Sequence, residues 1–253
     1  DPAEMVTFVE NKPVTNNMES KIRHIESVGE YCGSLGVAAQ HPLVAVVDFA
    51  EARPVYHMRQ TFGFYAVFLK EVRCGDMIYG RNYYDYQEGT LVCLAPGQVI
   101  GFEDNGEKFQ PKWALVFHPD LIRGTMLGRN MKEYTYFSYE VNEALHLSET
   151  ERSLVVDSLR KIRLELGHAI DRHSRRLVTT QIEVLLDYCL RFYERQFITR
   201  AHVNHDVLTR FERLLDDYFA EGRARSEGLP TVKYCAGQLC LSPNYFGDLV
   251  KRE

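Results

Sequence analysis

The sequence predicts the α+β fold class, with strands first and helices afterwards. Between His41 and His118 the chain holds short runs rich in Val, Phe, Tyr and Leu, separated by turn signals. After about Arg129 the apolar residues recur at helical spacing instead. The last 23 residues have the pattern of two short helices joined by a tight turn. These observations divide the chain into three parts, residues 1–147, 148–204 and 205–253.

The first part is predicted to be a β-domain, because many short strands with regular turns are typical of a sandwich or a small barrel. Its expected strands are residues 43–49, 62–69, 77–79, 90–94 and 112–117. Turn signals lie between these runs, at Cys74-Gly-Asp, Glu88-Gly, Pro96-Gly and Asp104-Asn-Gly. The residues before about 40 carry only short apolar pieces and are interpreted as an N-terminal arm.

The second part is predicted to be an αα-hairpin. Ser148 suits a helix N-cap, and Glu149 and Glu151 in the first turn suit the helix dipole. Gly167 weakens this helix, and a second helix is expected over 171–197. The apolar stripe of the first helix either forms a dimer seam or packs on the β-domain or on the second helix, and the pattern does not choose between these. The seam residues are Leu154, Leu159, Ile162 and Leu166.

The third part contains an expected helix over 207–220 and then the terminal segment, Thr231–Glu253. Ala236 is small where the two helices of this segment would cross. Ser242 can cap the second helix, and Pro243 then lies at its first position, where no backbone N–H is needed. This arrangement indicates a helix-turn-helix, whose second helix enters the major groove of DNA.

The bulk composition indicates a packed globular chain. Of 253 residues, 45% are hydrophobic and 12% aromatic, and no apolar run approaches the ~20 residues of a membrane span. No signal-peptide pattern is present at the start. The six cysteines are scattered without a C-x-x-C pair, which predicts free thiols and a reducing, cytoplasmic setting. The net charge of −5, with a nearly neutral third part, counts against tight DNA binding by this segment alone.

Four stretches of the sequence carry a family resemblance. Ala236-x3-Cys240-Leu-Ser-Pro-Asn-Tyr-Phe-x-Asp-Leu-x-Lys-x-Glu253 closely resembles the first of two helix-turn-helix units in the AraC/XylS family of bacterial transcription regulators. Tyr84-Asp-Tyr-x-x-Gly89-Thr-Leu-x-x-x-Ala-Pro-Gly-Gln98 and Trp113-x-Leu-x-Phe-His-Pro-Asp-Leu121 resemble the family's cupin-like sensor barrel. Leu185-Leu-x-Tyr-x-x-Arg-Phe-Tyr-x-Arg-Gln-Phe197 resembles the helical linker of one subgroup. Because a second helix-turn-helix follows in the family, we expect that the chain is cut inside its DNA-binding domain.

The resemblance implies a ligand-responsive regulator that reads promoter DNA, with full affinity only when the second helix-turn-helix is present. Asn can bond adenine bidentately and Asp can accept from cytosine, whereas Lys and the helix N-terminus suit phosphate. Gly247 and Asp248 stand where better-known members carry polar or basic residues. The residues that the resemblance assigns to DNA are Ser242, Asn244, Tyr245, Gly247, Asp248 and Lys251.

The cupin-like barrel is expected to enclose a small-molecule effector. Tyr and Trp offer a flat apolar face and a polar edge to a sugar ring, and Arg suits a carboxylate, so the effector would be a sugar or a small acid. The expected pocket residues are His57, Arg59, Tyr65, Tyr79 and Trp113. Each of them can also be a packing or surface residue, because strand alternation leaves the inward face ambiguous. We further expect a cytoplasmic homodimer with no membrane contact.

Catalytic and metal-binding patterns are missing from the sequence. No H-x-H pair occurs, His57 and His118 stand alone, and His168 and His173 are five apart and do not share a helix face. No G-x-S-x-G elbow, P-loop or dinucleotide fingerprint occurs. The sequence therefore predicts a non-enzyme without catalytic residues, metal or cofactor. A cupin enzyme, metal-free or metal-dependent, and a protein-interaction module remain as alternatives.

Overall fold

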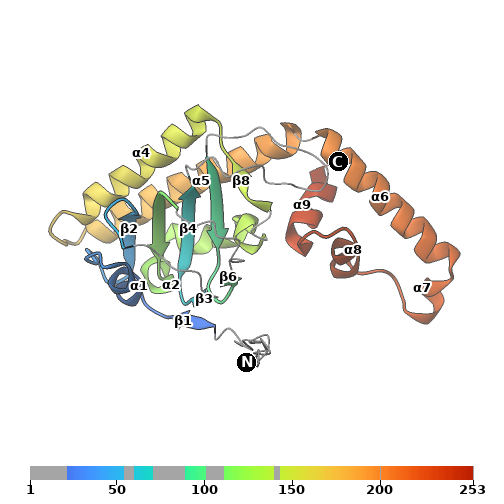
Figure 1. Ribbon diagram of the computed structural model, residues 1–253, viewed down its shortest axis with the longest axis horizontal. Coiled ribbons are helices and arrows are strands. Elements are labelled where there is room, and N and C mark those ends of the chain that lie inside the picture. The colour runs from blue at the N-terminus through green and yellow to red at the C-terminus, as the bar shows by residue number, and fades with distance from the viewer. Residues whose placement is uncertain are drawn as a thin grey trace, which may run out of the picture.

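The computed structural model describes residues 22–53, 60–70, 89–100, 111–139, 143–199 and 201–252. These segments combine helices with sheets, so the expected α+β class is confirmed. Figure 1 shows the strands gathered at one end of the molecule and the last helices at the other, joined by a long helix that runs between them. Within the described segments, no helix has both the length and the apolar character needed to cross a bilayer.

Five strands form the main sheet, which is antiparallel throughout, in the order β2-β7-β4-β5-β8. They are β2 (Val44–Asp48), β4 (Tyr65–Lys70), β5 (Thr90–Leu94), β7 (Trp113–Phe117) and β8 (Leu145–His146). Strand β4 pairs on both sides, so Val67 lies opposite Cys93 of β5 and opposite Leu115 of β7. The runs expected at 43–49, 90–94 and 112–117 correspond to β2, β5 and β7. The run expected at 62–69 is divided, because Phe62 ends a strand of the smaller sheet and β4 begins only at Tyr65, and the run expected at 77–79 lies outside the described residues.

A smaller sheet consists of β1 (Arg23–Ile25), β3 (Gln60–Phe62) and β6 (Val99–Ile100), in the order β1-β3-β6. It shares a buried core with helix α1 (Val28–Leu35) and with one face of the main sheet. In that core the rings of Phe62 and Phe64 stack at 5.1 Å, and Tyr31 lies edge-on to both. The described strands thus form two separate sheets, and the closed cupin-like barrel expected from the sequence is not seen among them.

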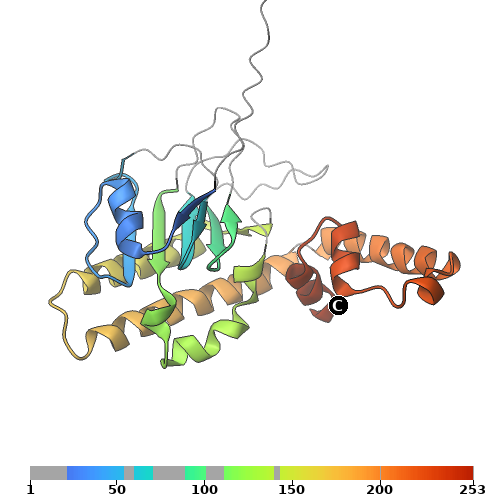
Figure 2. The same ribbon diagram turned by 90° about the horizontal axis from the view of Figure 1, so that it is seen from below.

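Helices α4 (Glu149–Leu166) and α5 (Ser174–Thr199) form the expected hairpin, which covers the other face of the main sheet (Figure 2). Helix α4 begins with a capping box, in which the Ser148 hydroxyl accepts from the Glu151 N–H and the Glu151 carboxylate accepts from the Ser148 N–H. Arg195 of α5 donates to the same Glu151 carboxylate and to the carbonyl of His146. One residue therefore ties α5 to both α4 and β8.

The α4 stripe packs inside the chain, which corrects the expected dimer seam. Leu159, Ile162 and Leu166 are buried in the core that the hairpin forms with the main sheet. At most 7% of the surface of each is exposed, so they offer almost nothing to a second copy. Of the four expected seam residues, Leu154 alone reaches the surface, with 36% of its area exposed. Packing on the β-domain and on the second helix, the other reading of this stripe, is the arrangement found.

The described part of the connection from β7 to β8 is helical and packs against α5. It consists of α2 (Pro119–Ile122), α3 (Met126–Asn130) and the 3-10 turns η1 (Met131–Glu133) and η2 (Thr135–Ser138). Tyr136 is 1% exposed and donates its hydroxyl hydrogen to the carbonyl of Leu186 on α5. Tyr134 donates to the Asp187 carboxylate, 2.8 Å away. These bonds fix η2 and its flanks against α5.

The last four helices are α6 (Ala201–Ala220), α7 (Arg223–Ser226), α8 (Val232–Gln238) and α9 (Pro243–Arg252). They have a core of their own, in which Cys235, Ala236, Leu239 and Phe246 pack on the half-buried face of α6. Figure 2 shows these helices beyond the end of α5, with α9 nearest the sheets. The third part of the chain therefore has a small core of its own, whereas Tyr245 and Leu249 of α9 are buried in the core of the main sheet and the hairpin.

Candidate nucleic-acid interface

Helices α8 and α9 form a helix-turn-helix. The Thr231 hydroxyl caps α8 by accepting from the Tyr234 N–H at 3.1 Å. The chain then turns through Cys240, whose φ is 58°, and the Leu241 N–H donates back to the Ala236 carbonyl at 2.9 Å. Ala236 is fully buried between the helices, the position that its small size predicts.

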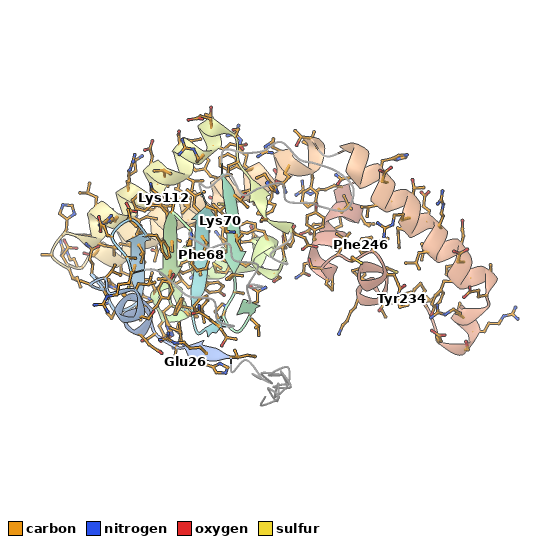
Figure 3. The ribbon with its side chains drawn as sticks, viewed as in Figure 1. Glu26, Phe68, Lys70, Lys112, Tyr234 and Phe246 are labelled. Carbon is orange, nitrogen blue, oxygen red and sulfur yellow. The ribbon has the colours of Figure 1, made fainter. Side chains whose placement is uncertain are left out.

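The helix-turn-helix is braced by α6. Phe246 of α9 meets the ring of Phe211 edge-on at 5.0 Å, and Tyr234 lies 5.5 Å from the ring of Tyr218. Figure 3 shows Phe246 and Tyr234 on the side of the two helices that faces α6. The opposite side of α9 is the one on which a reader helix presents residues to DNA.

One flank of α9, next to the side that faces α6, contacts the N-terminal domain, by which we mean the two sheets, the connection from β7 to β8 and the hairpin of α4 and α5. At the start of α9, the Ser242 N–H and hydroxyl both donate to the Glu143 carboxylate, at 2.7 and 2.5 Å. Ser242 also caps α9, because its hydroxyl accepts from the Tyr245 N–H at 3.2 Å. Glu143 and Ser242 are each 2% exposed, so this contact excludes water.

A second contact lies nearly two turns further along α9, at Asp248. The Tyr139 hydroxyl donates to Oδ2 of Asp248 at 2.8 Å. Burial, with a further contribution from this hydrogen bond, raises the pKa of Tyr139 above its ordinary value of 10, so the phenol remains a donor at neutral pH. The Tyr245 ring lies between Tyr139 and Phe197, with centroids 5.2 and 5.0 Å away.

The end of α9 makes a third contact, with α5. The Arg252 guanidinium lies 4.9 Å from the centre of the Phe197 ring and 3.5 Å from the carboxylate of Glu194. Asn244 and Lys251 point to solvent, and Lys251 is 79% exposed. Of the six residues assigned to DNA, Ser242, Tyr245 and Asp248 thus bind the N-terminal domain, Asn244 and Lys251 stay exposed, and Gly247 is intermediate.

The expected effector residues are not brought together. Tyr65 and Trp113 lie on the face of the main sheet that is turned toward the helices, not in the space between the two sheets. There Tyr65 stacks on Phe117 at 5.1 Å, and the Arg163 guanidinium lies 6.0 Å from the Trp113 ring. His57, Arg59 and Tyr79 lie outside the described residues.

The described segments contain other hollows. One of about 470 Å³ lies between α3 and the start of α5, lined by Arg123, Arg172, Arg175 and Arg176 among others. It shares no lining residue with the expected effector pocket. In the described part of the chain, no group of three or more His, Cys, Asp or Glu side chains is placed to hold a metal ion.

Sequence reasoning missed the partners of α9, which are Tyr139, Glu143, Glu194 and Phe197. Ser242 and Glu143 are 99 positions apart, and no periodicity links residues at such a distance. The cluster of tyrosines around 134–139 was the available signal, since so many phenols need buried hydrogen-bond partners.

Comparison with protein-family models, with curated proteins and with solved structures gives no match for this chain.

Proposed function

We propose that this chain is a ligand-responsive, sequence-specific DNA-binding transcription regulator of the AraC type. The observation that carries the proposal is the helix-turn-helix of α8 and α9, with Ala236 buried between its helices and a tight turn at Cys240. A helix-turn-helix with its own supporting helix is an arrangement that places a second helix in the major groove. The sequence resemblance of the same segment adds the family.

In this proposal the N-terminal domain, as a cupin-like barrel, senses a small molecule such as a sugar or a small acid, and the regulator acts in the cytoplasm as a homodimer. The order of the parts supports it, because a β-domain, a helical hairpin and a helix-turn-helix follow one another along the chain. A thermal-shift screen of sugars and small acids tests the effector. Sedimentation at high micromolar concentration tests the dimer, and a monomer there would contradict it.

DNA binding is tested by selecting bound duplexes from a random-sequence library and measuring the affinity of the enriched sequence by fluorescence anisotropy. We expect an enriched motif and an affinity that falls steeply with salt, because phosphate contacts release counterions. Lys251→Ala should weaken binding and reduce the salt slope by about 1, since Lys251 is exposed at the end of α9.

The matched control is Lys161→Ala, which removes an exposed lysine from α4, outside the helix-turn-helix. It should leave the affinity unchanged. If no sequence is enriched and Lys251→Ala behaves as Lys161→Ala does, the DNA-binding function is wrong. The docked face of α9 would then favour a protein-interaction module.

A further inference from the structure

A carboxylate occupies the start of the recognition helix, where DNA would place a phosphate. The free N–H groups at a helix N-terminus, with a capping hydroxyl beside them, form a ready anion site that reader helices use for the DNA backbone. Here the Ser242 N–H and hydroxyl both donate to Glu143. A phosphate and the Glu143 carboxylate cannot use these two donors at the same time.

We propose that this chain has a closed state in which Glu143 takes the place of a DNA phosphate and holds the recognition helix against η2 and α5. DNA and the N-terminal domain then compete for the start of α9 and for the flank that carries Tyr245 and Asp248. The inference rests on the proposed DNA-binding function and adds to it how the N-terminal domain would reduce the DNA affinity of α9.

Two base-reading positions are covered by the same contact. Both oxygens of Asp248 are engaged, Oδ2 by the Tyr139 hydroxyl at 2.8 Å and Oδ1 by the Lys251 ammonium at 3.7 Å. The Tyr245 side chain is 7% exposed, enclosed by Tyr139 and Phe197. Tyr245 and Asp248 cannot contact a base edge while they are bound in this way, so the closed state has lost part of its reading surface, although Asn244 stays exposed.

The surface that receives α9 is fixed to the N-terminal domain. The Glu143 carbonyl accepts from the Tyr193 hydroxyl at 3.4 Å. The Gln196 side chain then brackets the next residues, donating to the Ala144 carbonyl at 3.2 Å and accepting from the His146 N–H at 2.8 Å. Because both anchors lie on α5, opening the closed state means that α9 leaves a preformed surface.

Aromatic rings connect this surface to the main sheet. Tyr65 lies 5.2 Å from Phe137, Phe137 5.3 Å from Tyr136, and Tyr136 5.1 Å from Tyr193. Tyr193 in turn lies 5.4 Å from Tyr139, which contacts α9. An effector that binds the N-terminal domain with different affinity in the closed and open states would shift the balance between them.

The closed state lowers the apparent DNA affinity, because the apparent Kd is the intrinsic Kd divided by the open fraction. Glu143→Ala removes both bonds to Ser242 and should tighten binding about tenfold. Tyr139→Phe removes the hydrogen bond to Asp248, together with one to Thr135 in the same domain, and should tighten DNA binding about threefold. Hydrogen exchange at the amides of α9 should become faster in both variants without any DNA present.

The matched control is Tyr134→Phe. Tyr134 donates to Asp187 at 2.8 Å, as Tyr139 donates to Asp248 at 2.8 Å, but Asp187 belongs to α5 and not to α9. Tyr134→Phe therefore removes the same kind of bond from the same connecting segment without changing any contact of α9. Its α9 exchange and DNA affinity should match those of the unchanged chain.

The probe is the duplex that the Glu143→Ala variant enriches from a random-sequence library at about 50 mM salt, where phosphate contacts are strong. Faster α9 exchange and tighter binding in both variants, with Tyr134→Phe unchanged, support the closed state. If the unchanged chain binds the same duplex as tightly as both variants do, or if α9 exchange does not change, the closed state is overturned and DNA binding stands. If no variant enriches any sequence, the proposed function itself fails, and the closed state with it.

Discussion

The ring of Tyr139 meets the ring of Tyr245 edge-on, with centroids 5.2 Å apart and planes at 78°. Tyr139 follows η2 in the N-terminal domain, and Tyr245 is in the first turn of α9, so this pair joins the two packing units of the chain. Edge-on aromatic pairs are favoured by the ring quadrupoles beyond the area that they bury. The pair is therefore part of what holds α9 in place, independently of the hydrogen bonds beside it.

A double-mutant cycle with Tyr139→Leu and Tyr245→Leu measures this contact. We expect a coupling of about 0.5–1.5 kcal/mol in the free energy of urea unfolding. The matched cycle pairs Tyr139→Leu with Phe211→Leu, because Phe211 packs on the other side of α9 against Phe246. That second cycle should be additive within about 0.5 kcal/mol. Equal coupling in both cycles would mean that Tyr139 acts on the helices generally and not through Tyr245.

Base reading is tested at Asn244, which is exposed on α9 in the closed state. Asn244→Ala should cost ~1–3 kcal/mol at one base-pair position, because an asparagine that bonds adenine discriminates against the other bases. Selection from random-sequence duplexes, repeated with Asn244→Ala and Asp248→Ala, gives the position of each lost preference. An unchanged preference in both variants would contradict the assignment of α9 as the reading helix.

Local elements could be predicted from the sequence because their causes are local. The Ser148 cap and the acidic first turn predicted the start of α4, and the capping box is present. Ser242 and Pro243 predicted the start of α9, and Ala236 predicted the close contact between α8 and α9. In each case the deciding residues lie within a few positions of the element that they specify.

The relations between distant elements could not be predicted. Tyr65 and Trp113 were expected in a pocket, but strand register turns them toward the helices, and a shift of one residue would have reversed this. The apolar stripe of α4 does not indicate which surface it packs against. In the structure Leu159 and Ile162 of this stripe are buried in the core between the hairpin and the main sheet. The bond of Glu143 to Ser242 joins residues 99 apart, which only the folded chain brings together.

Cys240 carries backbone strain that can be relieved. Its φ of 58° lies in the left-handed region, which costs an L-residue roughly 1–2 kcal/mol and costs glycine little. Cys240 is exposed, whereas Cys32, Cys93, Cys189 and Cys235 are buried free thiols, so the substitution removes little packing. Glycine also has more conformational entropy in the unfolded chain, which offsets part of the relieved strain. Cys240→Gly should therefore raise the free energy of unfolding by about 0.5–1 kcal/mol.

Cys240→Ala is the matched control, because it removes the sulfur but keeps the Cβ that the left-handed conformation disfavours. It should not be stabilising. Equal unfolding midpoints for the two variants would show that the turn at Cys240 is not strained in solution.

His41 makes the stability depend on pH. Burial lowers its pKa below the ordinary value of 6.5, and its Nδ1 accepts from the Leu43 N–H at 3.1 Å, which requires the neutral ring. Between the lowered pKa of the folded chain and the unfolded value of about 6.5, the unfolded chain binds more protons than the folded chain. The free energy of unfolding therefore falls as pH drops from about 6.5 to the folded-state pKa. His41→Asn keeps an acceptor for the same N–H, because an asparagine oxygen bonds the backbone two residues on, but it does not titrate. Thermal unfolding measured at pH 7.5 and at pH 5.5 should therefore show a smaller loss of Tm in His41→Asn than in the unchanged chain. The control is His205→Asn, which replaces an exposed histidine of α6 and should lose as much Tm between the two pH values as the unchanged chain does.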